Sequence, residues 1–290
     1  MRDFFVGVNR MKFYAWASVV SQILIVVTGG LVRLTGSGLG CPTWPECQPG
    51  SLTNVPELGI HGIIEFSNRL LTFVLLLISI LTFVTVFSFA KAQRKGLFWT
   101  SFVLGLGIVA QAVIGGVSVL TGLNSYIVGT HFLVSAALIT VATILLWYTY
   151  GKKVLPANKS LKNVTAVLYP VGIITVIIGV LVTGSGPHAG DAKTPRNGIS
   201  PDFISHLHSY PAYLTLGLVL LQMFLAFRSN AKVTSSLWLL VALIVQAIIG
   251  IWQTRTGLPI ELVTAHLLGA STLVSLLTWQ QVSRGIWITK

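Results

Sequence analysis

The chain has 290 residues, of which 53% are hydrophobic and only 9% are charged, and its mean hydropathy is +0.82. A soluble domain carries about 25% charged residues, so this composition excludes an ordinary soluble protein and predicts a polytopic membrane protein. The net charge of +12 would suggest nucleic-acid binding in a soluble protein, but here we interpret it as membrane topology and expect no nucleic-acid partner.

Eight apolar stretches follow one another along the chain, each near the ~20 residues that cross a bilayer as a helix. They cover residues 13–34, 61–90, 97–120, 126–150, 163–184, 203–227, 236–254 and 260–282. We therefore predict an all-α integral membrane protein with eight transmembrane helices. No processing site follows the first stretch, so we do not expect a cleaved signal peptide.

The distribution of charge predicts the orientation of these spans. An even number of spans places both termini on one side, and fourteen of the nineteen Lys and Arg residues fall on that side. By the positive-inside rule this side is the cytoplasm, so both termini are expected there. Six of the seven acidic residues and all six histidines fall on the other side. We therefore expect the active site of a multi-pass plasma-membrane protein to lie toward the extracytoplasmic side.

The first outer loop carries the only two cysteines of the chain, Cys41 and Cys47, in the sequence Cys-Pro-Thr-Trp-Pro-Glu-Cys. Two nearby thiols outside the cytoplasm can form and keep a disulfide. The short loop with two prolines predicts a small ring that is easier to reduce than most. A structural disulfide and a redox relay both fit this pattern.

The second span begins with a stripe of polar side chains. His61, Glu65 and Asn68 fall on one face of a helix of 3.6 residues per turn, with Arg69 at the edge of that face. A carboxylate inside a membrane segment is costly and is a functional candidate by default, so we predict a catalytic role for Glu65. The alternative is that Glu65 only pairs with Arg69 one turn away or caps the helix.

The chain contains an internal repeat. Three pairs of residues are each separated by 135 positions: Gln111 and Gln246, Thr121 and Thr256, and His131 and His266. This spacing indicates a duplication of four spans, with halves 1–155 and 156–290. Because each half holds an even number of spans, we expect two parallel four-helix bundles related by a pseudo-two-fold axis along the membrane normal.

The repeat also relates single histidines to one another. His131 and His266 each lie a few residues inside the outer end of the last helix of a half, and His208 lies at a similar depth where the first half has Asn68. Imidazoles at one depth on two helices of a bundle are typical of axial haem ligands. We favour His208 over His206 as the ligand. The alternative for each is a polar residue satisfied between helices.

Five cations fall on the outer side against the general bias: Arg33, Arg69, Lys193, Arg196 and Arg255. Those at helix ends, Arg33, Arg69 and Arg255, could bind the two propionates of a haem, because a guanidinium pairs with a carboxylate through two parallel bonds. The alternative is that they extend to the lipid headgroups. The Gly- and Pro-rich loop 185–202 predicts a lid over the second half, with His188 exposed.

Together these segments resemble the haem A synthase family over essentially the whole chain. The resemblance rests on the loop Thr35–Cys47, on Glu65-Phe-Ser-Asn-Arg69, on Thr183–Asp191 and on the paired Gln…Thr-Gly-Leu…His segments. It implies oxidation of the C8 methyl of haem O to a formyl group, which gives haem A for a terminal oxidase. It also implies a resident haem b on His208 and His266, a substrate haem O near His131 and Glu65, and redox exchange at Cys41 and Cys47.

Two departures from the family pattern suggest one branch of the family. Asn68 stands where many members have histidine, and a second outer cysteine pair is absent. His61 precedes Asn68 by two turns, roughly 10 Å along the axis, so we expect the substrate haem to keep an open axial position unless His61 fills it.

We expect as partners haem O synthase, a membrane electron donor or thiol–disulfide protein, the lipid bilayer, and other copies of the chain in a homo-oligomer. Three other functions compete with the enzyme. A b-type cytochrome that only transfers electrons would need the histidines but not Glu65. A transporter with parallel repeats would place its polar residues near the midplane. A disulfide-generating oxidoreductase would not explain the histidines.

Overall fold

The computed structural model describes residues 8–89, 94–151 and 153–288, and most of them lie in long helices. The helices are α2 (Val8–Leu34), α3 (Gly59–Phe89), α4 (Arg94–Leu120), α5 (Ser125–Thr149), α6 (Lys159–Ser185), α7 (Pro201–Arg228), α8 (Thr234–Arg255) and α9 (Ile260–Ser283), with a short 3-10 turn η1 (Pro56–Leu58) before α3. Within these ranges the chain forms no β-strand.

The eight predicted spans are confirmed as eight helices that are long and apolar enough to cross a membrane. The predicted bounds agree with the observed ones within five residues, except that the predicted end of the second span, residue 90, lies outside the described residues. Such helices satisfy their own backbone hydrogen bonds, which is what a bilayer interior requires. The protein is therefore an all-helical, multi-pass membrane protein.

Local sequence signals explain where several helices begin and end. The side chains of Asn124, Asn158 and Ser200 accept hydrogen bonds from the first turns of α5, α6 and α7. The Thr-Gly-Leu turns that follow α4 and α8 each place a leucine in the left-handed region, with φ of 60° at Leu123 and 61° at Leu258. The two outer turns of the repeat therefore share one unusual backbone shape.

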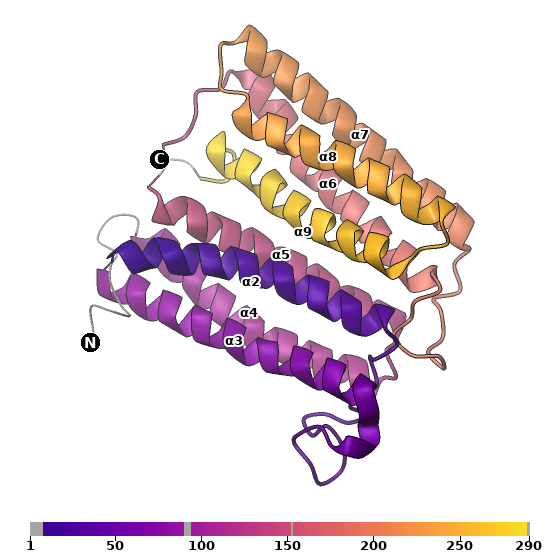
Figure 1. Cartoon of the computed structure of the whole chain (residues 1–290). Helices are drawn as coiled ribbons and strands as arrows, with labels where there is room; N and C mark the ends of the chain where they lie inside the picture. The colour runs from indigo at the N-terminus through magenta and orange to yellow at the C-terminus, as the bar shows by residue number, and fades with distance from the viewer. Residues whose placement is uncertain (1–7, 90–93, 152, 289–290) are drawn as a thin grey trace.

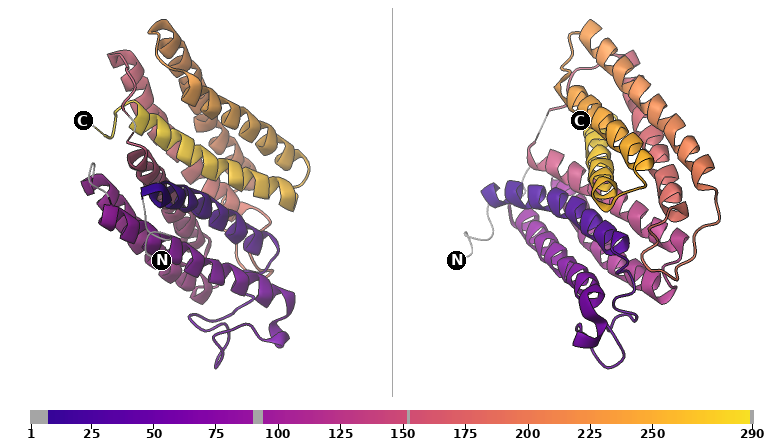
Figure 2. Two further views of the ribbon diagram at one scale, coloured as in Figure 1. Left: turned by 60° about the vertical axis from the view of Figure 1, so that its left-hand side comes forward. Right: turned by 45° about the vertical axis from the view of Figure 1, so that its right-hand side comes forward.

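The helices group by their contacts along the chain. In the first group, α2, α3, α4 and α5 pack in a closed cycle of neighbours, and in the second group α6 packs on α7, α7 on α8, α8 on α9 and α9 on α6. Figures 1 and 2 show the indigo-to-magenta group beside the rose-to-yellow group, with α9 lying against α2 and α5.

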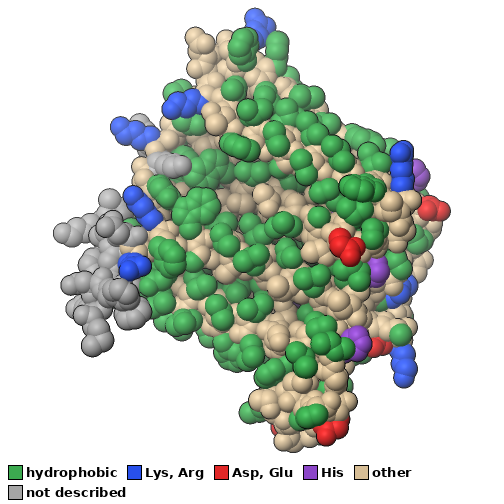
Figure 3. Space-filling view, viewed as in Figure 1, with side chains coloured by type: hydrophobic (Ala, Val, Ile, Leu, Met, Phe, Trp, Pro, Cys, Tyr) green, Lys and Arg blue, Asp and Glu red, His purple; other side chains and the backbone are tan. Residues whose placement is uncertain are grey.

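The exterior is apolar along most of its length. Figure 3 shows hydrophobic side chains over the broad middle of this face, with acidic and histidine side chains near the end opposite the two termini. Many large apolar side chains on α3, α4, α7 and α8 are exposed. Exposed apolar surface on this scale matches a lipid environment rather than water.

The seam between α5 and α9 is formed by small hydroxyl side chains in a reciprocal pattern. Thr143 Oγ1 lies 2.9 Å from Ser275 Oγ, and the Thr278 hydroxyl donates to Thr140 Oγ1 at 3.3 Å. Thr140 and Ser275 are separated by 135 residues, and so are Thr143 and Thr278. Each of the two contacts is therefore the repeat equivalent of the other. Small hydroxyl residues let helices approach closely and bond across the seam.

Removing one of these hydroxyls should weaken the seam. We expect Thr278→Val to lower the stability of the protein in detergent by about 0.6 kcal/mol, the average for an interhelical hydrogen bond in a membrane protein. The matched control is Thr272→Val, because the Thr272 hydroxyl bonds only to the carbonyl of Leu268 in its own helix. Denaturant titration followed by circular dichroism measures both, and equal stability of the two variants would contradict the assignment.

Candidate functional site

The first outer loop folds back against the start of α3 and is closed by a disulfide between Cys41 and Cys47. Both cysteines are fully buried, with 0% of their surface exposed. Gly40 lies so close to α3 that an added Cβ would fall 2.2 Å from the His61 carbonyl oxygen. Only a glycine allows this approach, so the loop is held tightly against the helix.

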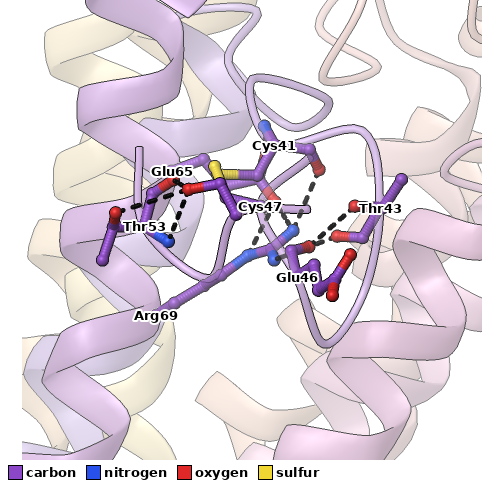
Figure 4. Close-up of a disulfide and its surroundings, with 8 residues drawn as sticks. Cys41, Thr43, Glu46, Cys47, Thr53, Glu65 and Arg69 are labelled. Carbon is purple, nitrogen blue, oxygen red and sulfur yellow. Dashed lines mark hydrogen bonds and ion pairs between the residues drawn. A yellow bond between two sulfur atoms is a disulfide. The ribbon is translucent and has the colours of Figure 1, made fainter. Parts of the chain in front are cut away.

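Glu65 and Arg69 connect α3 to this loop, as Figure 4 shows. Glu65 is 5% exposed; its Oε2 accepts a hydrogen bond from the Cys41 backbone N–H at 2.7 Å, and its Oε1 pairs with the Arg69 guanidinium at 2.6 Å. The remaining donors of Arg69 bond to the carbonyl oxygens of Cys41, Thr43 and Glu46. The ion pair that the sequence offered as an alternative is therefore present, within a larger network that includes the disulfide loop.

The other polar residues of the predicted stripe have separate environments. His61 is exposed, and its Nδ1 lies 2.8 Å from Ser37 Oγ in the outer loop. Asn68 is half-buried, and its Oδ1 is enclosed without a hydrogen-bond partner. Its Nδ2 lies 3.9 Å from the position of a Cβ on Gly29 of α2. Asn68 therefore faces the space between α2 and α3 with an acceptor that no described group satisfies.

His131 and His266 occupy matching positions in the two helix groups. Gln111 donates to the His131 carbonyl at 3.0 Å, and Gln246 donates to the His266 carbonyl at 2.7 Å. Each imidazole packs against a glycine of the preceding helix: Gly115 for His131 and Gly250 for His266. An added Cβ would lie 3.3 Å and 3.2 Å from the respective Cε1 atoms, so these glycines make room for the rings. The Nδ1 atoms of both rings are buried without a partner.

His208 and His266 face one another across the second helix group. Their ring centroids are 6.5 Å apart with an interplanar angle of 68°. His208 packs against Gly179 of α6, where an added Cβ would lie 2.9 Å from its Cε1. His206, the other histidine of the segment, is exposed.

The spacing of the two rings fits a metal held between them. A metal–nitrogen bond is about 2 Å long, and each ring nitrogen lies about 1 Å from the centre of its ring. Two imidazoles on opposite sides of one metal therefore have ring centres about 6 Å apart. The Nδ1 atoms of His208 and His266 are both buried without a hydrogen-bond partner, and the ring spacing fits a pair of histidines that ligate a haem iron. The residues present therefore suit the group that the sequence predicted.

The outer cations differ in their surroundings. Arg33 donates to the Thr183 carbonyl at the end of α6, which ties α2 to the second helix group. Arg255 is exposed at the end of α8. Of the three arginines predicted to bind haem propionates, Arg69 already bonds to Glu65 and to the loop carbonyls.

The loop 185–202, which the sequence predicted as a lid over the second half, contacts both helix groups. Gly38 in the first outer loop donates to the Gly190 carbonyl at 2.8 Å, and His188 Nε2 lies 2.9 Å from the Leu258 carbonyl. His188 is half-buried, so its predicted exposure is wrong. The reason is the left-handed turn at Leu258, which presents its carbonyl to the loop.

Two features of the site were missed by sequence analysis. The first is that the Trp44 ring packs onto Gly116 of α4. The second is that each of His131, His208 and His266 packs the Cε1 side of its ring against a glycine of a neighbouring helix. The Gly115-Gly116 pair beside the repeated Gln111 could have suggested a close contact on α4. Which side chain makes that contact depends on the fold of the first outer loop.

These observations define an eight-helix membrane protein that encloses paired histidines and a buried carboxylate near one end of its helices. The family of cytochrome oxidase assembly proteins designated COX15-CtaA matches residues 12–278, and the chain belongs to that family.

Similar proteins are named heme A synthase. That of Listeria monocytogenes serovar 1/2a (strain ATCC BAA-679 / EGD-e) is 27% identical over 291 residues, which cover 93% of each chain. That of Lysinibacillus sphaericus (strain C3-41) is 41% identical over 142 residues, which cover 48% of this chain and 44% of the relative. That of Geobacillus thermodenitrificans is 28% identical over 157 residues, covering 54% of this chain and 48% of the relative.

The arginine network should protect the disulfide from reduction. Because both cysteines are buried, an attacking thiolate reaches the sulfur atoms only when the loop lifts from α3. We expect Arg69→Gln to accelerate reduction by a mild thiol about ten-fold or more, since it leaves Glu65 and three carbonyls without their donor. Thiol labelling over time measures the rate. Arg228→Gln, at the far end of α7, is the control, and equal rates in both variants would contradict the role of Arg69.

Proposed function

We propose that the protein is a haem A synthase that oxidises the C8 methyl of haem O to a formyl group and so supplies haem A to a terminal oxidase. The family match and the full-length relatives named heme A synthase support this function. The observation that carries it in the structure is the combination of facing histidines in one helix group with a histidine and a buried carboxylate in the other. A bound haem would supply the redox-active iron for oxidation of an unactivated methyl group, which no side chain can provide.

We propose that the chain consists of two parallel halves, 1–155 and 156–290, related by a pseudo-two-fold axis between α5 and α9. Three observations support this organisation. The contacts group the helices four and four, the hydroxyl pairs of the seam exchange under the repeat, and the glutamine and glycine neighbours of His131 recur around His266. A duplication with an even number of spans produces this arrangement.

The two halves would hold two haems of different roles. His208 and His266 would ligate a resident haem b in the C-terminal half, and the ring spacing supports His208 over His206. In the N-terminal half, haem O would lie against His131, with Asn68 on the opposite helix. Haem propionates would meet Arg33 and Arg255 near the outer ends of α2 and α8, where both side chains lie.

Glu65 would act on the substrate from a fixed position. The Cys41 N–H and Arg69 hold its two oxygens, so the carboxylate loses little freedom when substrate binds. A carboxylate held in this way can stabilise positive charge that develops at the reacting carbon or accept a proton from it. The same contacts place the disulfide loop directly beside the acid.

We place the protein in the branch with Asn68 and a single outer cysteine pair, and we orient it with both termini in the cytoplasm and the active site toward the outside of the plasma membrane. The excess of Lys and Arg near the termini supports this orientation. Its expected partners are haem O synthase as the substrate donor, a membrane electron donor or thiol–disulfide protein, the surrounding lipid, and further copies of the chain.

The function is tested by haem extraction from membranes that contain the protein together with a haem O source. We expect formyl haem with the parental chain and a loss of conversion of about 100-fold or more with Glu65→Gln, within the range of an acid–base residue. Glu261→Gln, an exposed acid at the start of α9, is the matched control. A red protein without conversion would instead indicate an electron-transferring b-type cytochrome, and full activity of Glu65→Gln would leave Glu65 a structural partner of Arg69.

The resident haem should depend on one histidine of the segment 206–208. We expect His266→Ala and His208→Ala to abolish the low-spin haem b spectrum of the purified protein, and His206→Ala to retain it, because only His208 faces His266. Optical spectroscopy of the reduced protein measures this. Loss of the spectrum in His206→Ala with retention in His208→Ala would reverse the assignment.

The substrate haem should keep an open axial position. Asn68 offers an amide, a poor iron ligand, and His61 is bonded to Ser37 in the outer loop. We therefore expect carbon monoxide to bind the reduced protein loaded with haem O, and Asn68→His to suppress that binding by supplying a second imidazole. Resonance Raman spectra that show only six-coordinate low-spin haem in the loaded parental protein would contradict this prediction.

A further inference from the structure

We propose that Trp44 is a substrate-contact residue that covers the outer side of the haem O site in the N-terminal half and sets how tightly the substrate is held. This inference rests on the proposed function, because it assigns the N-terminal half to haem O.

The first observation is the contact between Trp44 and α4. A Cβ added to Gly116 would lie 2.3 to 2.6 Å from three atoms of the Trp44 ring, so the indole lies directly on the helix backbone. Gly116 is buried by this contact, while Trp44 itself remains half-exposed. One part of the indole is therefore fixed against α4, and another part is accessible.

The second observation is the position of this contact relative to His131. Gly115, the preceding residue of α4, packs against the His131 ring, and an added Cβ there would lie 3.3 Å from the His131 Cε1. Trp44 and His131 therefore lie on adjacent faces of the same helical turn. An aromatic side chain in this position can add apolar contact to a flat aromatic ligand bound near His131.

The third observation is that the contact belongs to one half only. The repeat places Gly250 at the position of Gly115 but Ile251 at the position of Gly116, and Ile251 is 50% exposed. The C-terminal half, which would keep its haem b permanently, thus has a bulky side chain where the N-terminal half has a glycine covered by Trp44. A cover is needed only where the ligand must be admitted, held during reaction and released.

The fourth observation is how the loop is anchored. The disulfide joins Cys41 and Cys47 on either side of Trp44, and Arg69 binds the carbonyls of Thr43 and Glu46. The backbone on both sides of Trp44 is therefore fixed to α3, the helix that carries Glu65. This anchoring makes Arg69 a positioning residue for the indole as well as for the carboxylate.

The test measures haem release rather than conversion. Purified protein loaded with haem O is mixed with an excess of a soluble apo-haem protein, and the transfer of haem O and of haem b is followed by extraction and chromatography. We expect Trp44→Ala to accelerate haem O release about ten-fold, equivalent to about 1.4 kcal/mol, with haem b release unchanged. Trp44→Phe should restore most of the retention. Trp99→Ala, a 59% exposed tryptophan on α4, should release both haems at the parental rates.

A second variant keeps the tryptophan but removes its contact. Gly116→Ala should accelerate haem O release as Trp44→Ala does, because the new Cβ overlaps the indole. Parental release rates in both variants, equal acceleration of haem b, or a parental chain that retains no haem O would overturn the inference. A parental chain that retains haem O through Trp44 but never converts it would overturn the proposed function and leave the inference standing, so the two failures are distinguishable.

Discussion

The arrangement of the site depends on the bonds that Arg69, near the outer end of α3, makes to Glu65 and to the disulfide loop. A guanidinium within a membrane-spanning helix is costly unless its donors are satisfied, and here they are satisfied by Glu65 and by three carbonyls of the disulfide loop. One side chain therefore fixes the position of the candidate acid and the conformation of the loop above it. The Cys41 N–H, which bonds to the other oxygen of Glu65, closes the network.

The two helix groups show how a duplicated fold can hold two different sites. The glutamine and the glycine beside each terminal histidine are kept in both groups, so each imidazole has the same support from the preceding helix. The residues facing these histidines differ. His208 faces His266 in one group, whereas the other group has Asn68, a buried carboxylate and a tryptophan-bearing loop at the corresponding end. Shared support with different opposing residues would allow one site with two histidine ligands and one site with a single histidine ligand.

The features that depend on local pattern could be predicted from the sequence. Hydropathy located the eight helices, because the length of a span is set by the bilayer, and the 135-residue spacing paired His131 with His266. The depth of the histidines in their helices also suggested that His208, rather than His206, faces His266.

The features that depend on the packing of loops could not be predicted in the same way. Arg33 of α2 binds the Thr183 carbonyl at the end of α6, where the two helix groups meet. His188, in the loop 185–202, is half-buried against the Leu258 carbonyl. The contact of Trp44 with Gly116 joins residues that are far apart in the chain and has no counterpart in the second repeat. Such contacts depend on how the first outer loop folds onto the helices, which neither hydropathy nor periodicity describes.

We propose that the two helix groups hold haem in two different ways. A cryo-electron-microscopy structure of the protein loaded with haem O tests it most directly. We expect one haem with its iron between His208 and His266, and a second haem beside His131 and below Trp44, with no protein ligand on the side of Asn68. A single haem shared between the groups, or two haems that each have two protein ligands, would contradict this arrangement.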